Sequence, residues 1–245
     1  MMSRIEENRT MRVVIAGGTS GVGLAAAARL AAGGDEVFIT GRSDERLQSA
    51  LKELGGQVKG EVADARDTEA MRALFERLGS VDHLIITVTG RGGAGPLSAL
   101  TGDGLLAAVR NKLVPHLLTA QAALPVLSKE GSITFLTAAS AGAAYPGVAT
   151  LAAVNGAIEA TVPGLAVELA PVRVNAISPG VIDTDWWSEI GDEARTAFLE
   201  GTAASLPTGR VGTPEDVAAT IEYVVRNAFV TGTVLTVDGG GRLKA

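Results

Sequence analysis

The chain has 245 residues, of which 47% are hydrophobic and 20% charged, and its net charge is −6. This length suits one α/β domain, and the acidic balance disfavours nucleic acid or an anionic membrane as the partner, because both select clustered Lys and Arg. The chain lacks cysteine and its two histidines, His83 and His116, have no ligand spacing, so we expect a small-molecule partner and no metal.

The first residues are charged and lack the apolar stretch of a signal peptide, and no run of about 18 apolar residues follows. We therefore expect a flexible lead over residues 1–10, a single domain over residues 11–245, and a cytoplasmic protein without a membrane partner.

Short apolar runs rich in β-branched residues alternate with longer stretches of helical composition. The seven expected strands are residues 12–16, 36–40, 57–62, 83–88, 132–137, 173–177 and 234–237. The expected helices are residues 21–32, 44–54, 68–78, 104–127, 150–169 and 214–226. This alternation predicts a parallel sheet with helices on both faces and a ligand site at the carboxyl ends of the strands.

A glycine-rich loop joins the first expected strand to the first expected helix. Gly17, Gly21 and Gly23 permit a tight turn, close approach to a pyrophosphate and close helix packing. The helix N-terminus offers free N–H groups around Val22, and Thr19 and Ser20 add hydroxyl groups. A plain turn is the alternative, but the position after the first strand favours a dinucleotide site.

The second strand is followed by Gly41 and Arg42, where dinucleotide folds often carry an acid that binds the adenosine ribose. Without that acid, Arg42 is expected to pair with a 2′-phosphate, which favours NADP(H) over NAD(H); the alternative is a solvated arginine. Asp64, followed by Ala65, is expected to accept from the adenine amino group, or else to cap the next helix, whereas Asp67 is expected to be a helix cap.

Several motifs resemble those of the short-chain dehydrogenase/reductase family. Residues 16–23, AGGTSGVG, differ from the family's T-G-x-x-x-G-x-G only in the first position, and residues 175–184, NAISPGVIDT, match the segment beside the nicotinamide. The resemblance covers residue 11 to the C-terminus. It implies a single-domain Rossmann fold, an oxidoreductase acting on a small carbonyl or alcohol, and a homotetramer or homodimer.

The resemblance also implies further cofactor contacts. Around the nicotinamide these are Pro179, Gly180, Ile182 and Thr184. After the fourth strand the family has N-N-A-G, and this chain has Thr87, Val88, Thr89 and Gly90, so backbone contacts to the ribose are expected at the last three. A substrate lid is implied around residues 184–210, where Trp186 and Trp187 either cover an apolar substrate or lie in an interface.

The catalytic positions of the family differ in this chain. Its tyrosine and its lysine, four residues apart, fall on Leu151 and Asn155, its serine on Ala138, and its asparagine on Lys112. A hydride transferred to a carbonyl leaves an alkoxide that must be protonated, which Leu151 cannot do. The sequence therefore indicates a non-standard active site.

Three residues are candidates for the missing chemistry. Tyr145 is a candidate proton donor whose pKa Lys112 would lower, and the favoured alternative is that Tyr145 packs a turn. Asn155 is expected to bind the nicotinamide ribose or to be a satisfied helix residue. His116 is assigned to helix packing. Because fold alone does not settle chemistry, a catalytically silent dinucleotide-binding sensor or scaffold is the main alternative, and a lyase or isomerase a weaker one.

Overall fold

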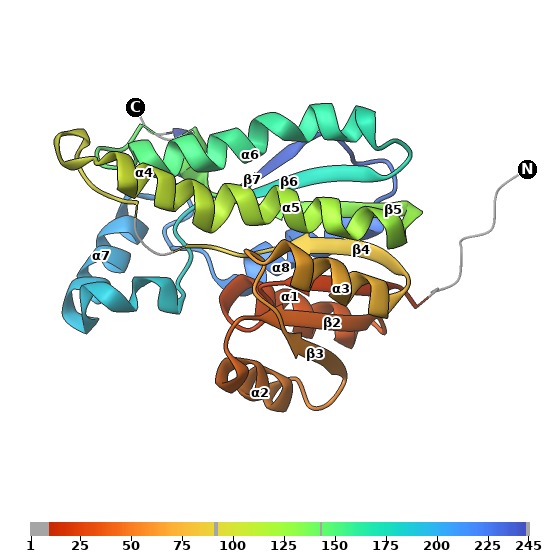
Figure 1. Cartoon of the computed structure of the whole chain (residues 1–245). Helices are drawn as coiled ribbons and strands as arrows, with labels where there is room; N and C mark the ends of the chain where they lie inside the picture. Colours follow the sequence, from red (N-terminus) through yellow and green to blue (C-terminus); the bar gives the residue numbers. More distant parts are fainter. Residues whose placement is uncertain (1–9, 91–92, 143, 244–245) are drawn as a thin grey trace, which may run out of the picture.

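The computed structural model describes residues 10–90, 93–142 and 144–243, so nearly all of the lead expected over residues 1–10 lies outside the described chain. Seven parallel strands form one sheet in the order β3-β2-β1-β4-β5-β6-β7 (Figure 1). Their bounds are β1 Arg12–Ala16, β2 Glu36–Gly41, β3 Val58–Val62, β4 Val81–Ile86, β5 Leu127–Leu136, β6 Arg173–Pro179 and β7 Val234–Val237. The predicted fold class is confirmed.

Helices cover both faces of the sheet, because successive apolar side chains of each strand point to opposite sides. Val13 and Ile15 belong to one buried cluster and Val14 and Ala16 to the other. The first cluster includes side chains of α1 (Gly21–Ala32), α2 (Asp44–Glu53) and α8 (Pro214–Arg226). The second includes those of α3 (Thr68–Leu78), α5 (Val114–Ala123) and α6 (Ala149–Glu168).

The order of the strands reverses between β1 and β4, which places a crevice at their carboxyl ends, the usual ligand site of such sheets. β4 ends at Ile86, two residues before its predicted end, so Thr87 and Val88 belong to the loop at this crevice.

The helix expected over residues 104–127 is not a regular α-helix. α4 (Gly102–Ala108) continues into a π-helical turn, η2 (Val109–Leu113), and then into α5, with a 3-10 turn, η3 (Leu124–Val126), at the end. A π turn adds one residue to the helical register and is often found at functional sites. Here it carries Asn111 and Lys112.

A lobe formed by η5 (Asp185–Ile190) and α7 (Asp192–Ser205) stands beyond the end of the sheet (Figure 1). The rings of Trp187 and Phe198 lie 4.5 Å apart and join the two elements, and Trp186 meets Trp187 edge to face at 4.5 Å. An ion pair of 2.5 Å between Arg195 and Asp183 fastens α7 to the segment after β6.

Arg173, at the start of β6, holds the end of α8. It is only 7% exposed, and its guanidinium donates to the carbonyl oxygens of Val224 at 2.6 Å, Val225 at 2.7 Å and Val230 at 3.1 Å. The carbonyl groups in the last turn of a helix have no amide donor within the helix, and the guanidinium of Arg173 supplies donors to two of them.

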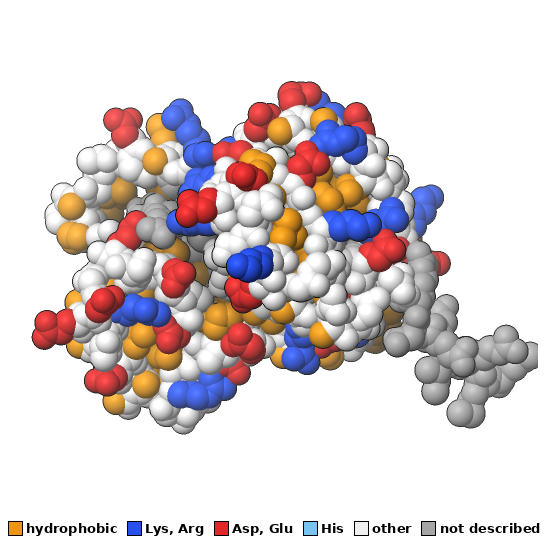
Figure 2. Space-filling view, turned by 90° about the horizontal axis from the view of Figure 1, so that it is seen from below, with side chains coloured by type: hydrophobic (Ala, Val, Ile, Leu, Met, Phe, Trp, Pro, Cys, Tyr) orange, Lys and Arg blue, Asp and Glu red, His pale blue; other side chains and the backbone are white. Residues whose placement is uncertain are grey.

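By length and composition alone, α6 is apolar enough to cross a membrane. In this fold Ile158 and Val162 bury one side of it against the sheet, while Val167 on the same helix is 80% exposed. On the face of the molecule in Figure 2, acidic and basic side chains are interspersed, with apolar side chains between them.

Candidate active site

The glycine loop crosses the carboxyl ends of β1 and β2. Gly17 has φ of +96° and Gly21 φ of +51°, conformations that favour glycine. The amides of Gly17 and Gly18 both donate to the carbonyl oxygen of Thr40, at 3.0 and 3.1 Å. The loop is therefore fixed to the sheet by its backbone and leaves its outer side open.

Gly23 is required where the loop becomes α1. A Cβ there would lie 2.4 Å from the carbonyl oxygen of Gly17 and 2.6 Å from Thr87 Oγ1. The Thr87 hydroxyl lies 3.2 Å from Ala16 O and 3.0 Å from Gly17 O, to which it can donate. Thr87, at the family's first asparagine position, thus fastens the loop after β4 to the glycine loop.

The start of α1 is open to a ligand. Ser20 is the N-cap residue in an extended conformation, and among the described residues its side chain makes no capping hydrogen bond. Thr19 packs against Gly41 at the end of β2, and a Cβ on Gly21 would lie 3.4 Å from Thr184 Cγ2. The glycine loop and the segment after β6 therefore meet at this helix N-terminus.

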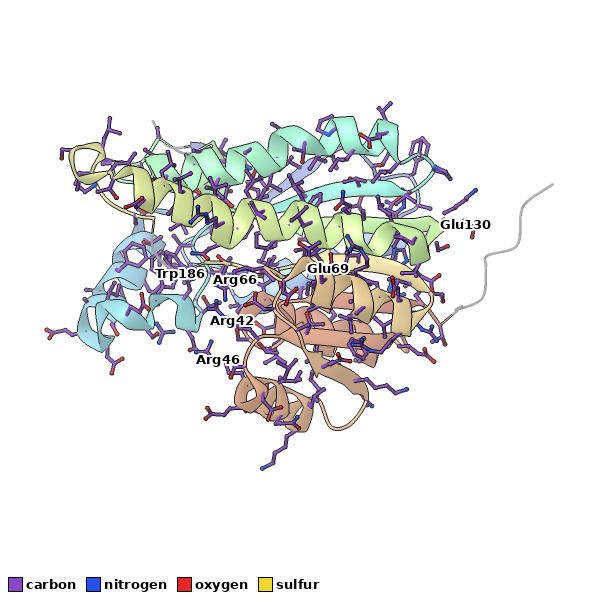
Figure 3. All side chains as sticks on the ribbon, in the orientation of Figure 1. Arg42, Arg46, Arg66, Glu69, Glu130 and Trp186 are labelled. Carbon is purple, nitrogen blue, oxygen red and sulfur yellow. The ribbon has the colours of Figure 1, made fainter. Side chains whose placement is uncertain are left out.

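Charged side chains gather after β2 and β3. Arg66 Nε and Nη2 donate to both carboxylate oxygens of Asp64, at 2.5 to 3.0 Å, and the nearby Arg42 also attracts this carboxylate. The Arg66 hydrogen bonds, with help from Arg42, lower the pKa of Asp64. Figure 3 labels Arg42, Arg46 and Arg66, which lie on the side of the molecule where β2 and β3 end.

Helix-capping roles for Asp64 and Asp67 are two of the sequence predictions that this region tests. Asp64 does not cap α3; its carboxylate pairs with Arg66, and Ala65 beside it is buried. Asp67 is the cap, accepting from the amide of Ala70 at 3.0 Å, as predicted.

The segment from Pro179 to Thr184 turns sharply over the end of β6. Gly180 donates to the carbonyl oxygen of Val237 at 2.9 Å, and a Cβ at Gly180 would lie 2.8 Å from Asp238. Ile182 is buried and its carbonyl oxygen accepts from Trp187 Nε1 at 2.9 Å. Thr184 caps η5, its hydroxyl accepting from the amide of Trp186 at 3.4 Å.

The loop after β4 packs against the π turn. A Cβ at Gly90 would lie 2.8 Å from Asn111 Cβ, and the hydroxyl of Thr89 donates to the carbonyl oxygen of Gly90 at 3.2 Å. Val88 packs partly buried against the second core cluster. The backbone of this loop thus forms one wall between the glycine loop and η2.

Leu151 and Asn155 lie one turn apart on α6, as in the family's tyrosine and lysine motif. Asn155 is 2% exposed, and its Nδ2 donates to Ser140 Oγ at 3.2 Å and to the carbonyl oxygen of Leu151 at 2.9 Å. Its Oδ1 is buried without a hydrogen-bond partner in the described chain. A buried acceptor of this kind is costly unless a donor reaches it.

The hydroxyl group that accepts from Asn155 lies two residues beyond the family's serine position. Ala138 occupies that position at the start of the 3-10 turn η4 (Ala139–Ala141), and Ser140 within η4 supplies the contact.

A polar cluster lies under this end of α6. Lys112 Nζ donates to the carbonyl oxygen of Thr137 at 3.5 Å, and Thr137 Oγ1 lies 2.7 Å from Glu159 Oε1. Ser178 Oγ donates to the same Glu159 oxygen at 2.7 Å. Burial lowers the pKa of Lys112 to about 8, against the opposing attraction of Glu159.

The structure does not bring Tyr145 and Lys112 into hydrogen-bond contact within the described residues. The Tyr145 hydroxyl donates to the carbonyl oxygen of Gly241 at 3.1 Å, in the 3-10 turn η6 (Gly241–Leu243). His116 is fully buried, with Nδ1 2.8 Å from Lys112 O and Nε2 3.1 Å from Leu136 O. Desolvation lowers the pKa of His116 to about 3, so its ring is neutral.

Sequence reasoning missed three residues of this region. Arg66 pairs with Asp64, Thr87 holds the glycine loop, and Glu159 accepts two hydroxyl groups. A signal existed for Glu159, which is the only charged residue of α6 before its C-terminal Glu168. Within the described ranges, no group of three or more His, Asp or Glu side chains is placed to hold a metal ion.

Comparisons with known proteins identify the family of this chain. The family model described as enoyl-(acyl carrier protein) reductase matches residues 16–241. The short-chain dehydrogenase/reductase ATR9 of Stachybotrys chlorohalonatus is 30% identical over 96% of this chain and 98% of its own length.

Solved structures of related proteins share the fold of this chain over nearly its whole length. A small-chain dehydrogenase crystallised with NADPH is 31% identical, with a TM-score of 0.81 over 96% of this chain and 100% of the other. The MalC reductase/Diels-Alderase of Malbranchea aurantiaca is 27% identical, with a TM-score of 0.86 over 96% of both chains. The chain therefore belongs to the short-chain dehydrogenase/reductase family of oxidoreductases.

Proposed function

We propose that this protein is an NADP(H)-dependent oxidoreductase that interconverts a small carbonyl compound and its alcohol through a non-standard active site. The observation that carries the proposal is the meeting of Gly21 and Thr184 at the open N-terminus of α1. It joins a glycine cradle suited to a pyrophosphate with the segment that the family uses beside the nicotinamide.

The residues present fit this cofactor. The pyrophosphate would lie on the glycine loop, with Thr19, Ser20 and the amides around Val22 as donors, and the adenine near Asp64 and Ala65. Arg42, joined by Arg66, would hold the 2′-phosphate. The unpartnered Oδ1 of Asn155 would accept from a hydroxyl of the nicotinamide ribose, which the backbone of Val88, Thr89 and Gly90 would also line.

The bound cofactor supplies the hydride; the protein must supply the proton. In the reductive direction, the Lys112 ammonium donates a proton to the oxygen of the reduced carbonyl, becomes a neutral amine and is recharged from solvent. Its low pKa suits a general acid near neutral pH. We assign this role to Lys112 rather than Tyr145, whose hydroxyl is bonded to Gly241. Leu151 would pack against the substrate where the family has its phenol.

Gly23→Ala is expected to weaken NADPH binding by about 10- to 100-fold and to lower the free energy of unfolding by about 1–3 kcal/mol. The added methyl group would collide with backbone oxygen of the loop that binds the pyrophosphate. Binding is measured by NADPH fluorescence and stability by urea unfolding. Gly201→Ala, on α7 with nothing within 4 Å of the added Cβ, is the matched control and should leave binding unchanged.

Arg42→Ala is expected to reduce the preference for NADPH over NADH by about 10- to 100-fold, because a charge-assisted contact to the 2′-phosphate is lost. The ratio of the two dissociation constants is the measurement. Arg72→Ala removes an exposed arginine of α3 that pairs with Glu69 and serves as control. An unchanged ratio in Arg42→Ala would show that Arg42 is a solvated side chain.

The proposed activity is tested by following NADPH oxidation with a broad panel of carbonyl and enoyl substrates. Leu151 and Asn155 at the family's catalytic positions favour a second candidate, a catalytically silent dinucleotide-binding sensor or scaffold. Saturable NADPH binding without turnover across the panel would support that candidate and contradict ours.

The remaining proposals concern location and assembly. We infer a cytoplasmic homotetramer or homodimer, with the exposed face of α6 as its interface. Ala153, Ala160 and Gly164 expose small side chains there that would allow close helix packing, and Val167 adds an exposed apolar group. Sedimentation of the purified protein tests the assembly.

A further inference from the structure

We infer that Glu159 is a positioning residue that keeps Lys112 protonated and directs its ammonium group toward the site; this inference rests on the proposed function. Glu159 belongs to none of the positions that the family motifs assign. It lies one helical turn after Asn155 and two turns after Leu151, on the same stripe of α6.

The carboxylate of Glu159 is held rather than free. Thr137 Oγ1 and Ser178 Oγ both lie 2.7 Å from its Oε1. Thr137 directly follows β5, and its hydroxyl also lies 3.1 Å from Ile177 O, a longer contact than the one to Glu159. Ser178 lies near the carboxyl end of the neighbouring strand β6. These two contacts fix the position of the carboxylate beside the carboxyl ends of β5 and β6.

Thr137 connects this charge to Lys112. Its hydroxyl faces Glu159, and its carbonyl oxygen accepts from Lys112 Nζ at 3.5 Å. The carbonyl group can orient the ammonium and the carboxylate can balance its charge without a direct ion pair. A direct ion pair between Lys112 and Glu159 would hold the ammonium proton tightly. With Thr137 between the two charges, the proton remains available for transfer.

The other titratable group facing Lys112 is His116 of α5, which lies against the Lys112 backbone and is neutral because it is buried. Among the described residues around the ammonium, Glu159 therefore supplies the opposing negative charge. A reduction that uses this ammonium should slow as pH rises through the pKa of Lys112, and Glu159 should set where that decline lies.

The test measures the pKa of the Lys112 side chain directly, so it does not require the protein to turn over a substrate. The chain has five lysines, at positions 52, 59, 112, 129 and 244, so carbon-13-labelled lysine gives a simple NMR spectrum in which Lys112→Met identifies the resonance. Glu159→Gln keeps an oxygen for the Thr137 and Ser178 hydroxyls but removes the charge. We expect the pKa of Lys112 to fall by at least about one unit, a tenfold change in the protonation equilibrium.

Two further variants separate charge from shape. Glu159→Asp retains the charge and should leave Lys112 closer to its wild-type pKa than Glu159→Gln does. Glu168→Gln, at the exposed end of the same helix, should leave the pKa unchanged. If Glu159→Gln does not fold, Ser178→Ala, which removes one of the two hydroxyls that hold the carboxylate, should still change the titration of Lys112.

An unchanged Lys112 titration in a folded Glu159→Gln variant overturns the inference, whatever the wild-type activity. If the wild type is active, the decline of NADPH oxidation at alkaline pH should begin at a lower pH in Glu159→Gln than in the wild type. A decline at the same pH in both proteins contradicts the role inferred for Glu159. If Lys112 responds but the wild type turns over no substrate, the proposed function fails and the charge coupling stands.

Discussion

Replacement of Lys112 by methionine is expected to lower turnover by about 10²–10⁴-fold, the usual cost of removing a general acid. Methionine has a similar length and fills the space beside Thr137, so NADPH binding should change little. The expected result is therefore a loss of turnover number without a comparable loss of cofactor affinity. Turnover of Lys112→Met within threefold of wild type would exclude Lys112 as the acid.

The same substitution should make the protein more stable at pH 7. The pKa of Lys112 is about 8 in the fold, against 10.5 for an unperturbed lysine, because burial disfavours the ammonium. Between these values the unfolded chain binds more protons than the folded one, so this group makes stability rise with pH across that window. Below pH 8 Lys112 is protonated in the fold, so the full cost of burying its ammonium group lowers the stability.

Methionine carries no such penalty, so Lys112→Met should gain about 2–3 kcal/mol below pH 8, since one pKa unit corresponds to about 1.4 kcal/mol and the attraction of Glu159 is already included in the pKa of Lys112. The difference should vanish above about pH 10.5. Urea unfolding of both proteins from pH 7 to pH 11 measures it, with the exposed Lys129→Met as control. A gain in stability with a loss of turnover identifies a group maintained for function.

Arg173→Met is expected to lower the free energy of unfolding by about 3–5 kcal/mol, without any direct effect on the site. Arg173 donates to three carbonyl oxygens; methionine leaves the two in the last turn of α8 without this donor, whereas Val230 O keeps the Nδ2 group of Asn175 at 2.9 Å. The cost is large because these carbonyls lie inside the protein, where water cannot readily replace the lost donor.

Urea unfolding at one fixed protein concentration measures this loss, since association would otherwise alter the apparent stability. Arg72→Met is the control. Its ion pair with Glu69 lies on the surface of α3, where such pairs contribute at most about 1 kcal/mol. A loss below about 1 kcal/mol in Arg173→Met would mean that the end of α8 finds other donors.

The features that the sequence predicts well are those encoded over a few neighbouring residues. Apolar runs separated by helical stretches are sufficient to predict the seven parallel strands. The strand, glycine loop and helix are likewise adjacent in sequence, and positive φ at Gly17 and Gly21 follows the expected turn. The cap at Asp67 depends only on the amide three residues later.

The features that the sequence does not predict depend on contacts between distant segments. One partner of Glu159 directly follows β5 and the other lies in β6, and helical periodicity on an almost wholly apolar helix does not reveal which side faces them. The π turn at Val109–Leu113 has no composition that distinguishes it from a continuous helix. The hydrogen bond from Tyr145 to Gly241 joins residues 96 positions apart.

The two tryptophans of the chain are adjacent, at the start of η5. One indole is anchored to the carbonyl oxygen of Ile182 and packed on Phe198, and the other lies against the first. Excitation at a wavelength selective for tryptophan therefore yields light from this six-residue segment alone. The protein contains its own optical reporter at the edge of the crevice, so movements of η5 can be followed in the unlabelled wild-type chain.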